Sequence, residues 1–583
     1  MKKTIILIAA AVAALQARAQ EPQSDLNRQM DVTREYEPTV NEARKLDVKP
    51  NMVDTVALRP EFSYGIHPSP IGYGFEVTPI RPVSVNLDNF RQLTPLYVRA
   101  GLGVPFQSVL DAYIATTGKT NGKWGGYVNH YGSWSDIKNV NGLKTPAAQT
   151  FNSAGVFGEH RFGRFGIGGE IGYDYDKVSR YGYDRDLLIS PDRFDASSAA
   201  LRQNFSTVRG RLDFGHSFED LSRFNVRFGV EGAYFQDHFD MKETDVKAYL
   251  ELGKRFGRLH EVTLRAGYDY YKGSGGLADY KDNVISVRPM YRLRGGKAEF
   301  ALGANIVFDD NGEDNETSFF PLLEFTWRAA KGFTPYLKVD GQYVNNGYRA
   351  TAARNPYVLQ GAYGANTSEY NGRIGIRGSS RSSFSYDVFG GYSRYRNMNF
   401  FTNFVYAPES DAGALPGNVF VPLGEDVWMW TLGGELEGRI SGSFGIEFGM
   451  QYRWYKEAGD LYDMDNGEPM GAVYRGLPDL TGRIALKYSY RDKLVVRAGV
   501  DVCGPRDFTV LGMAVNGFGE QALFYGKNHV DMQYDVHLGA EYNISKKIGV
   551  FVEGRNLANQ KLFRYNLYPS LGVNFLAGVK LQF

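Results

Sequence analysis

Eight histidines and one cysteine are the residues best suited to metal binding or nucleophilic chemistry in this chain of 583 residues. The histidines stand at positions 67, 130, 160, 216, 238, 260, 529 and 537, without an HExxH motif or paired ligand spacing. Cys503 alone can form neither an intramolecular disulfide nor a multi-cysteine metal site. GxSxG and Walker motifs are absent from the sequence. The sequence therefore predicts no enzyme, no cofactor and no metal site.

Two acidic stretches, residues 309–314 and 463–468, carry the oxygen ligands that calcium prefers. Neither has the full spacing of a calcium loop, so acidic residues in solvated turns are the favoured interpretation. The charge balance is 66 Lys+Arg against 65 Asp+Glu, a formal net charge of +1. This lacks the basic footprint of a nucleic-acid binder, and we expect no nucleic-acid partner.

The beginning of the chain has the pattern of a secretory signal peptide. A pair of lysines precedes an apolar run over residues 5–15, and small residues at Ala17 and Ala19 suit cleavage before Gln20. The sequence thus predicts a signal peptide over residues 1–19. No later stretch approaches 18 consecutive apolar residues, so the mature chain is either soluble outside the cytoplasm or crosses a membrane as strands.

Alternation of apolar and polar residues over about eleven positions favours membrane-crossing strands. In residues 444–454 the even positions are apolar, while the odd positions are Gly, Glu, Gln and Arg; residues 532–542 repeat the pattern. Strands of soluble proteins are shorter, at about five or six residues. Aromatic residues such as Tyr452 and Trp454 end the apolar stripes, where interfacial girdles would lie. The fold class predicted is all-β, a transmembrane antiparallel β-barrel; a soluble secreted sandwich is the weaker alternative.

Counting such segments gives 22 strands, an even number as expected for a single-chain barrel. Their predicted ranges are 96–104, 107–117, 124–134, 150–160, 164–176, 200–216, 222–236, 243–256, 259–272, 283–294, 296–308, 316–328, 333–345, 368–378, 383–394, 426–440, 443–456, 476–490, 493–503, 529–543, 547–555 and 572–583. Connections after even-numbered strands are short, and most after odd-numbered strands are long. Short turns should face the periplasm and long loops the outside. The connection near Pro105 is an exception, because it should be long and is nearly absent.

The polar faces of these strands supply candidate lumen-lining residues. They are Glu435, Glu437, Arg439, Glu447, Gln451, Arg453, Gln533, Asp535, His537 and Lys580. Their mixed charges favour a polar ligand, oligomeric or zwitterionic, over a simple anion.

The last strand carries the most specific local pattern in the chain. Its alternating apolar residues are Phe575, Ala577, Val579, Leu581 and the C-terminal Phe583. Such a strand resembles the signal that the barrel-assembly machinery of Gram-negative outer membranes reads. The alternative is an ordinary amphipathic edge strand.

Residues 552–583 extend this likeness. The Asn556-Leu557 step, the aromatic loop with Tyr568-Pro569, and the entry from Gly572 to Phe575 resemble the closing hairpin of the TonB-dependent receptor family. That family's barrel has 22 strands, which agrees with the count made from periodicity. The resemblance implies an outer-membrane protein that serves in passage or uptake of a solute or nutrient. In motif terms it covers only about the last thirty residues.

The front of the chain departs from that family. Residues 20–94 are too few for the family's folded plug, although residues 30–33 can be read as a TonB box and residues 34–40 look similar to a plugless, receptor-like subgroup. Prolines throughout the segment exclude a continuous helix or a regular sheet. It is interpreted as an extended tail that enters the lumen or reaches TonB or another periplasmic partner, with plain disorder an equal alternative.

The predicted organisation is a signal peptide over 1–19, a tail or reduced plug over 20–94 and an outer-membrane barrel over 95–583. The expected partners are outer-membrane lipid, the barrel-assembly machinery during biogenesis and a periplasmic protein at the tail. A different class of function stays open: a non-transporting structural or assembly subunit of an outer-membrane complex.

Overall fold

The computed structural model describes residues 95–583 apart from 117–120, 184–200, 219, 313–314, 380–383, 406–417, 456–459, 463–468, 492 and 516–520. The predicted signal peptide, its cleavage site, the tail and the second acidic stretch all lie outside the described residues. The described helices include none with the length and hydropathy of a membrane span.

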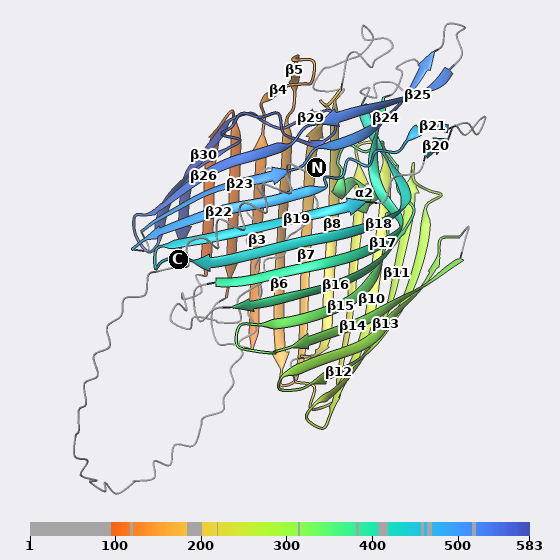
Figure 1. Cartoon of the computed structure of the whole chain (residues 1–583), viewed down its shortest axis with the longest axis vertical. Helices are drawn as coiled ribbons and strands as arrows, with labels where there is room; N and C mark the ends of the chain where they lie inside the picture. The colour runs from red at the N-terminus through yellow and green to blue at the C-terminus, as the bar shows by residue number, and fades with distance from the viewer. Residues whose placement is uncertain are drawn as a thin grey trace, which may run out of the picture. The chain divides into compact units, whose positions relative to one another are not determined.

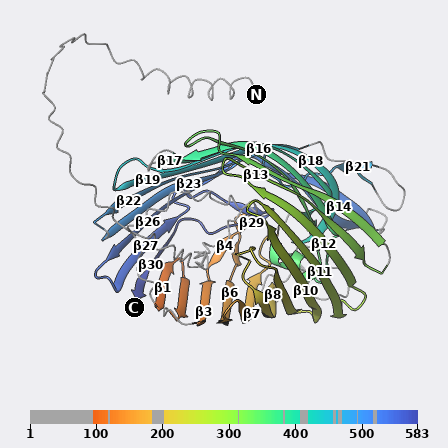
Figure 2. The ribbon, with the colours of Figure 1, turned by 90° about the horizontal axis from the view of Figure 1, so that it is seen from below.

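Within the described residues, 22 antiparallel strands form a closed wall and follow one another around it in chain order (Figures 1 and 2). Their bounds are β1 (Leu96–Val104), β2 (Gln107–Ala115), β3 (Gly122–Ser133), β6 (Gln149–Phe162), β7 (Phe165–Ser179), β8 (Arg202–His216), β9 (Asn225–Asp237), β10 (Met241–Phe256), β11 (His260–Gly275), β12 (Lys281–Arg294), β13 (Ala298–Asp310), β14 (Asn315–Trp327), β15 (Thr334–Val344), β16 (Thr367–Ser379), β17 (Phe384–Val405), β18 (Asn418–Arg439), β19 (Phe444–Tyr455), β22 (Leu480–Tyr490), β23 (Leu494–Cys503), β26 (Gln533–Asn543), β27 (Ile548–Arg555) and β30 (Asn574–Gln582). Pairing of β1 with β30 closes the wall, and Figure 2 shows the two strands side by side.

The predicted fold and all 22 predicted strands are confirmed. The first hairpin, with its short connection at Pro105, is real: β1 and β2 pair from Leu96 opposite Ile114 to Gly103 opposite Gln107. The largest difference concerns β17 and β18, which are 22 residues long each. The periodicity of apolar residues located only the part of each strand that lies in the wall. Beyond the wall the strands continue after a shift in their register at residues 395–398, and the alternation of apolar and polar residues changes there.

The outward face of the wall is apolar, as alternation predicts. Ile171, Ile374 and Leu432 are examples from three strands, with exposed fractions of 66%, 65% and 54%. Side chains of successive strand residues point to opposite faces, so the same strands present polar residues inward. An outward belt of exposed apolar residues around a closed barrel is the surface that lipid requires.

The two ends of the barrel differ, and we name them the short-turn end and the long-loop end. Short elements follow at the long-loop end: β4 (Asp136–Lys138) with β5 (Lys144–Pro146), α2 (Tyr348–Arg354), β20 (Asp460–Tyr462) with β21 (Pro469–Ala472), β24 (Arg506–Val515) with β25 (Gln521–Val530), and β28 (Phe563–Tyr565) with β29 (Tyr568–Pro569). The sequence analysis predicted none of them. The hairpin of β24 and β25 joins the wall through β17, where residues 403–405 pair in parallel with residues 510–512.

Candidate functional site

Three loops from well-separated parts of the wall meet at the long-loop end, and we call them the loop layer. They are residues 180–183 after β7, residues 345–366 between β15 and β16, and residues 562–571 between β27 and β30. In Figure 2, α2 and β29, which belong to these loops, are seen within the ring of wall strands. The loop layer therefore extends across the mouth of the barrel.

Hydrogen bonds join each of these loops to the next. A guanidinium nitrogen of Arg180 donates to the carbonyl oxygen of Val358 at 3.0 Å. The hydroxyl of Tyr181 donates to the carbonyl oxygen of Pro569 at 2.8 Å. The hydroxyl of Tyr565 donates to the carbonyl oxygen of Arg354 at 2.7 Å. The acceptors are main-chain carbonyls, so the contacts define the position of the backbone and not only of side chains.

Buried tyrosines form the centre of the loop layer. The ring of Tyr568 stacks on that of Tyr357, with centroids 3.8 Å apart, and meets Tyr181 edge-on at 5.0 Å. All three side chains are at least 95% buried. Position 182 admits only glycine, because a Cβ there would lie 2.3 Å from the Tyr568 ring. Burial raises the pKa of Tyr357 and Tyr568 well above the usual value, so both remain neutral.

The loop layer is also tied to the wall by main-chain pairing. The amide of Phe420 in β18 donates to the carbonyl oxygen of Tyr357 at 3.1 Å, and the amide of Leu359 donates to the carbonyl oxygen of Phe420 at 2.8 Å. Val358 and Phe420 thus form a parallel bridge. The long β18 continues past the belt to make this contact.

Acidic residues of the wall hold both ends of the loop between β15 and β16. At its ends, the Nδ2 atoms of Asn345 and Asn366 donate to Oδ2 of Asp282 at 2.5 and 2.8 Å. Within α2, Arg349 donates its Nε to Asp245 at 2.5 Å, and its amide donates to Glu243 at 3.0 Å. These hydrogen bonds attach the loop to β10 and β12.

Below the loop layer, charged residues of the wall are paired across strands. Arg209 on β8 contacts Glu170 at 2.7 Å and Asp174 at 2.9 Å, both on β7. Arg373 on β16 contacts Asp387 on β17 at 3.2 Å. Charges of both signs are therefore present on the polar face of the wall, in contact with one another. Within the described part of the chain, no group of three His, Cys, Asp or Glu side chains is arranged to hold a metal ion.

Six of the predicted lumen-lining residues lie on β18 and β19, on the strand face opposite the exposed apolar side chains. In the register of this pair Glu437 stands opposite Glu447, while Glu435 and Arg439 stand opposite glycines. Arg453 donates to Gln451 at 2.6 Å and is only 2% exposed.

The remaining four lie on β26 and β30. The side chain of Gln533 accepts from Arg506 at 2.9 Å, and Asp535 accepts from the amide of Asn556 at 2.8 Å. His537 lies 3.7 Å from Asp501, and Lys580 forms an ion pair with Glu541. The strands β22 and β23 separate this group from the first. The ten residues form two patches of the wall, and Gln533 and Asp535 serve to hold loops in place.

The terminal strand that carries Phe575, Ala577, Val579, Leu581 and Phe583 is paired on both sides, with β27 and with β1. The backbone of Phe583 exchanges two hydrogen bonds with that of Leu96, at 2.9 and 3.3 Å. In this barrel β30 is therefore one side of the closing seam. Its use as an assembly signal stays a prediction.

The sequence analysis missed the loop layer, the most elaborate part of the structure. Its signal was an unusual number of aromatic residues in long connections, such as the three between Phe563 and Tyr568 and the three tyrosines between Tyr348 and Tyr363. Loops that remain in water rarely need such residues, so aromatic side chains there indicate packing.

No family model matches this chain, and no curated protein matches it either. Among solved structures, the siderophore receptor PirA from Acinetobacter baumannii is 11% identical, with a TM-score of 0.59, covering 85% of this chain and 81% of its own. The FrpB iron transporter from Neisseria meningitidis (F5-1 variant) is 10% identical, with a TM-score of 0.60 and coverages of 85% and 83%. The copper transporter OprC is 12% identical, with a TM-score of 0.57 and coverages of 85% and 82%. At these identities the likeness concerns the fold, and this chain has the 22-stranded antiparallel β-barrel fold of these outer-membrane receptor and transporter structures.

Proposed function

We propose that this chain lies in the outer membrane of a Gram-negative cell and serves in the passage of a polar solute or nutrient. The observation that carries the proposal is a closed apolar-belted barrel with a polar inner wall, in the fold of solved structures described as siderophore receptors and as iron and copper transporters. The long-loop end would face the outside and the short-turn end the periplasm.

The chemistry of the wall favours a solute without a large net charge. Arg209 is balanced by Glu170 and Asp174, and Arg373 by Asp387, so a simple anion or cation would meet attraction and repulsion in turn. Of the ten candidate residues, Glu435, Glu437, Arg439, Glu447, Gln451, His537 and Lys580 would line this path, while the buried Arg453, Gln533 and Asp535 would hold neighbouring strands and loops. A zwitterionic or oligomeric polar solute fits such a wall.

The loop layer is the part of the barrel that must open for a solute to enter. It is fixed by side-chain and main-chain contacts between separate loops, so loss of a central tyrosine should loosen it without breaking the wall. This gives the mouth the role of a gate. The tail over residues 20–94 lies outside the described residues, and its contact with TonB or another periplasmic protein stays a prediction.

Passage can be tested with the purified full-length protein in liposomes, by following osmotic swelling with neutral, zwitterionic, anionic and cationic solutes. We expect faster entry of neutral and zwitterionic solutes through a Tyr568→Ala variant than through the wild type. The same variant should increase uptake of those solutes in cells. Absence of any solute flux through both proteins, with no uptake defect in a deletion strain, would contradict the transport proposal.

A second function has support from one observation. The loop layer covers the mouth with a packed aromatic centre, which suits a barrel whose outer surface serves as a docking platform. Such a protein would be a non-transporting structural or assembly subunit of an outer-membrane complex. Purification of the native protein distinguishes the two: a stable complex with envelope-assembly proteins and normal uptake after deletion would favour the subunit.

A further inference from the structure

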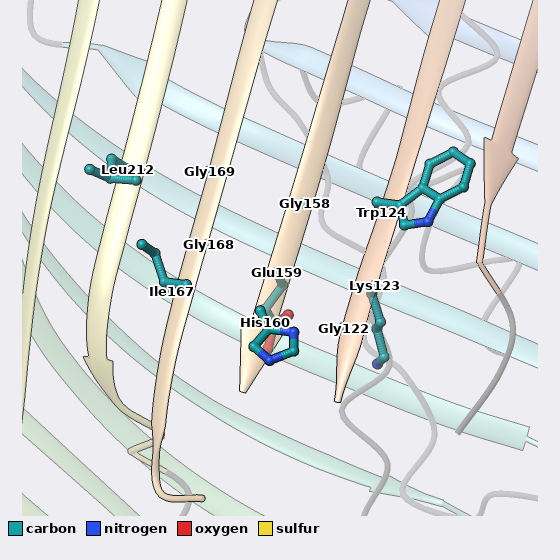
Figure 3. Close-up of a pocket in the computed structure, with 10 residues that line it drawn as sticks. All are labelled: Gly122, Lys123, Trp124, Gly158, Glu159, His160, Ile167, Gly168, Gly169 and Leu212. Carbon is teal, nitrogen blue, oxygen red and sulfur yellow. The ribbon is translucent and has the colours of Figure 1, made fainter. Parts of the chain in front are cut away.

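Charged residues of the wall occur in two settings. Near the short-turn end, Figure 3 shows Lys123 of β3 and Glu159 of β6, which are both exposed and stand opposite each other in the strand register. At the long-loop end, four buried acidic side chains accept hydrogen bonds from the loop between β15 and β16. They are Glu243, Asp245, Asp282 and Asp309, with exposed fractions of 1%, 3%, 1% and 6%. Buried carboxyl groups are costly in the ionised form unless cations pair with them.

The first pair of these side chains is Asp282 on β12 and Asp309 on β13. The Nδ2 atom of Asn366 donates to Oδ2 of Asp282 at 2.8 Å and to Oδ2 of Asp309 at 3.3 Å, so the two carboxyl groups are neighbours. A hydrogen bond also joins the two carboxyl groups directly. Their Oδ1 atoms are buried, and no amide, hydroxyl or cationic group of the described residues donates to them. A hydrogen bond between two carboxyl groups forms only when one of them carries a proton.

The second pair, Glu243 and Asp245, lies on β10. The two residues are two positions apart on one strand and share its inner face, and a hydrogen bond joins their carboxyl groups as well. Arg349 of α2 donates its Nε to Asp245 and its amide to Glu243. The Oδ1 atom of Asp245 is buried and has no such donor among the described residues. One guanidinium group thus serves two buried carboxyl groups.

The other titratable groups around the two pairs do not balance them. The tyrosine hydroxyls beside the pairs are neutral below about pH 9. Lys247 stands opposite Asp269, and Arg396 lies 2.7 Å from Glu316, so each of these cations has an acidic neighbour of its own. The full set is Tyr271 and Asp269 on β11, Lys247 on β10, Tyr280 before β12, Tyr343 on β15, Glu316 on β14, Arg396 on β17, Asp237 on β9 and Arg180 after β7.

The two pairs together place four buried carboxyl groups against the single guanidinium of Arg349. No group of three acidic, His or Cys side chains in the described part of the chain converges on a point where a metal ion could bind. A proton is therefore the cation that fits between the members of each pair.

We propose that each pair holds one shared proton while the loop between β15 and β16 is seated, and that loss of these protons to solvent at alkaline pH releases the loop. In a pair of adjacent carboxyl groups one pKa is raised, because both groups cannot ionise at short distance in a buried site. In a released loop the carboxyl groups would be hydrated and would titrate near their ordinary values of about 4.

The seated loop therefore binds more protons than the released loop. Its stability is full at acidic pH and falls as the pH rises through the raised pKa of each pair. The inference concerns the attachment of the loop and is independent of whether the barrel transports a solute.

The first test is hydrogen exchange of α2 in the full-length protein between about pH 6 and pH 9, expressed as protection factors that allow for the intrinsic pH dependence of exchange. Protection in the wild type should fall about tenfold for each pH unit and each proton until the raised pKa is passed. A double variant with Asp282→Asn and Glu243→Gln should keep its protection across this range, because an amide group can donate to the partner carboxylate at every pH. Asp340→Asn, on β15 and paired with Lys338, is the matched control and should respond to pH like the wild type.

The second test detects the protons themselves. Infrared difference spectra between the same two pH values should show loss of the carbonyl band of protonated carboxyl groups in the wild type and in Asp340→Asn, but not in the double variant. Heat-modifiable mobility would verify that each variant has a folded barrel.

Three results would overturn the proposal: protection of α2 in the wild type that does not change with pH, a double variant that responds to pH like the wild type, or no difference between their infrared spectra. Loss of protection on addition of EDTA at constant pH would also overturn it, because the unpartnered oxygens would then belong to a metal site.

Discussion

The ring of Tyr357 lies parallel to the ring of Tyr568, with 3.8 Å between their centroids and 21° between their planes. One tyrosine belongs to the loop between β15 and β16 and the other to the loop between β27 and β30, on a distant part of the wall. The chain has a single cysteine, so no disulfide joins these loops and non-covalent contacts hold them together. Such contacts can be undone by single substitutions and by a ligand that competes for them.

Tyr568→Ala should open the mouth while the wall stays intact. Truncation of a buried aromatic residue costs about 3–5 kcal/mol, and this cost falls on the loop layer because the wall is held by its own ladder of hydrogen bonds. Limited digestion with trypsin should show faster cleavage after Arg354 and Arg564. Tyr363→Ala, a substitution of a 46% exposed tyrosine in the loop that carries Tyr357, is the control. Equal digestion of the two variants would mean that the stacking does not hold the mouth closed.

Asp282→Ala should release both ends of the loop between β15 and β16. The substitution removes the acceptor that the half-buried amides of Asn345 and Asn366 share, at a cost of about 1 kcal/mol for each hydrogen bond lost, while the bonds to Tyr280 and Asp309 remain. Hydrogen exchange of α2 should accelerate, with little change in wall strands away from the loop. Asp340→Ala on β15 removes only a partly exposed ion pair with Lys338 and should leave the exchange of α2 unchanged.

Phe448→Arg should destabilise the barrel by about 2–4 kcal/mol if the position lies at the middle of the bilayer. Phe448 pairs with Leu436 and Ile484, both apolar members of the belt. Glu447→Arg, one residue away, is the control, because it places the charge on the other strand face, opposite Glu437. A substitution of Gln451 would be a poor control, because its side chain accepts a hydrogen bond from Arg453 that the substitution would remove. Unfolding in urea from lipid vesicles measures both variants, and equal stabilities would show that the two faces are wrongly assigned.

Deletion of Phe583 should reduce the amount of folded protein in the outer membrane. Deletion removes both the aromatic ring and the two backbone hydrogen bonds to Leu96, whereas Phe583→Ala removes only the ring. If the ring is the assembly signal, both variants should be depleted, as judged by heat-modifiable mobility of membrane fractions. If Phe583→Ala reaches normal levels while the deletion variant is depleted, the loss is due to the missing backbone hydrogen bonds between β30 and β1 and not to the missing ring.

Alternation predicted the wall well because lipid outside and polar groups inside impose opposite demands on successive residues. Strands such as β19 and β26 could be placed to within a few residues for this reason. The same rule could not place β24 and β25, because a hairpin beyond the membrane has no such pair of environments. The resemblance of residues 552–583 to the closing hairpin located Tyr568-Pro569, but local sequence holds no information on the partner at Tyr357.

The role of the candidate residues stays a prediction, because alternation bears only on the strand face that they occupy. Alternation predicts on which strand face Arg453 or Gln533 lies. It cannot show that these side chains form hydrogen bonds with neighbouring residues. The acidic anchor at Asp282 was missed because its partners, Asn345 and Asn366, lie far along the chain. Such sites depend on how loops fold back over the wall, and that is a property of tertiary packing.

The strands β17 and β18 are long enough to connect the wall of the barrel directly with the loop layer. Each strand continues from the lipid-facing wall, past an irregularity in their pairing at residues 395–398, to the loop layer, where β18 bonds to residues 357–359 and β17 pairs with β24. Rigid elements of this kind transmit displacement between distant sites. A molecule that displaces the β24–β25 hairpin would therefore also act, through β17 and β18, on the main chain beside Tyr357.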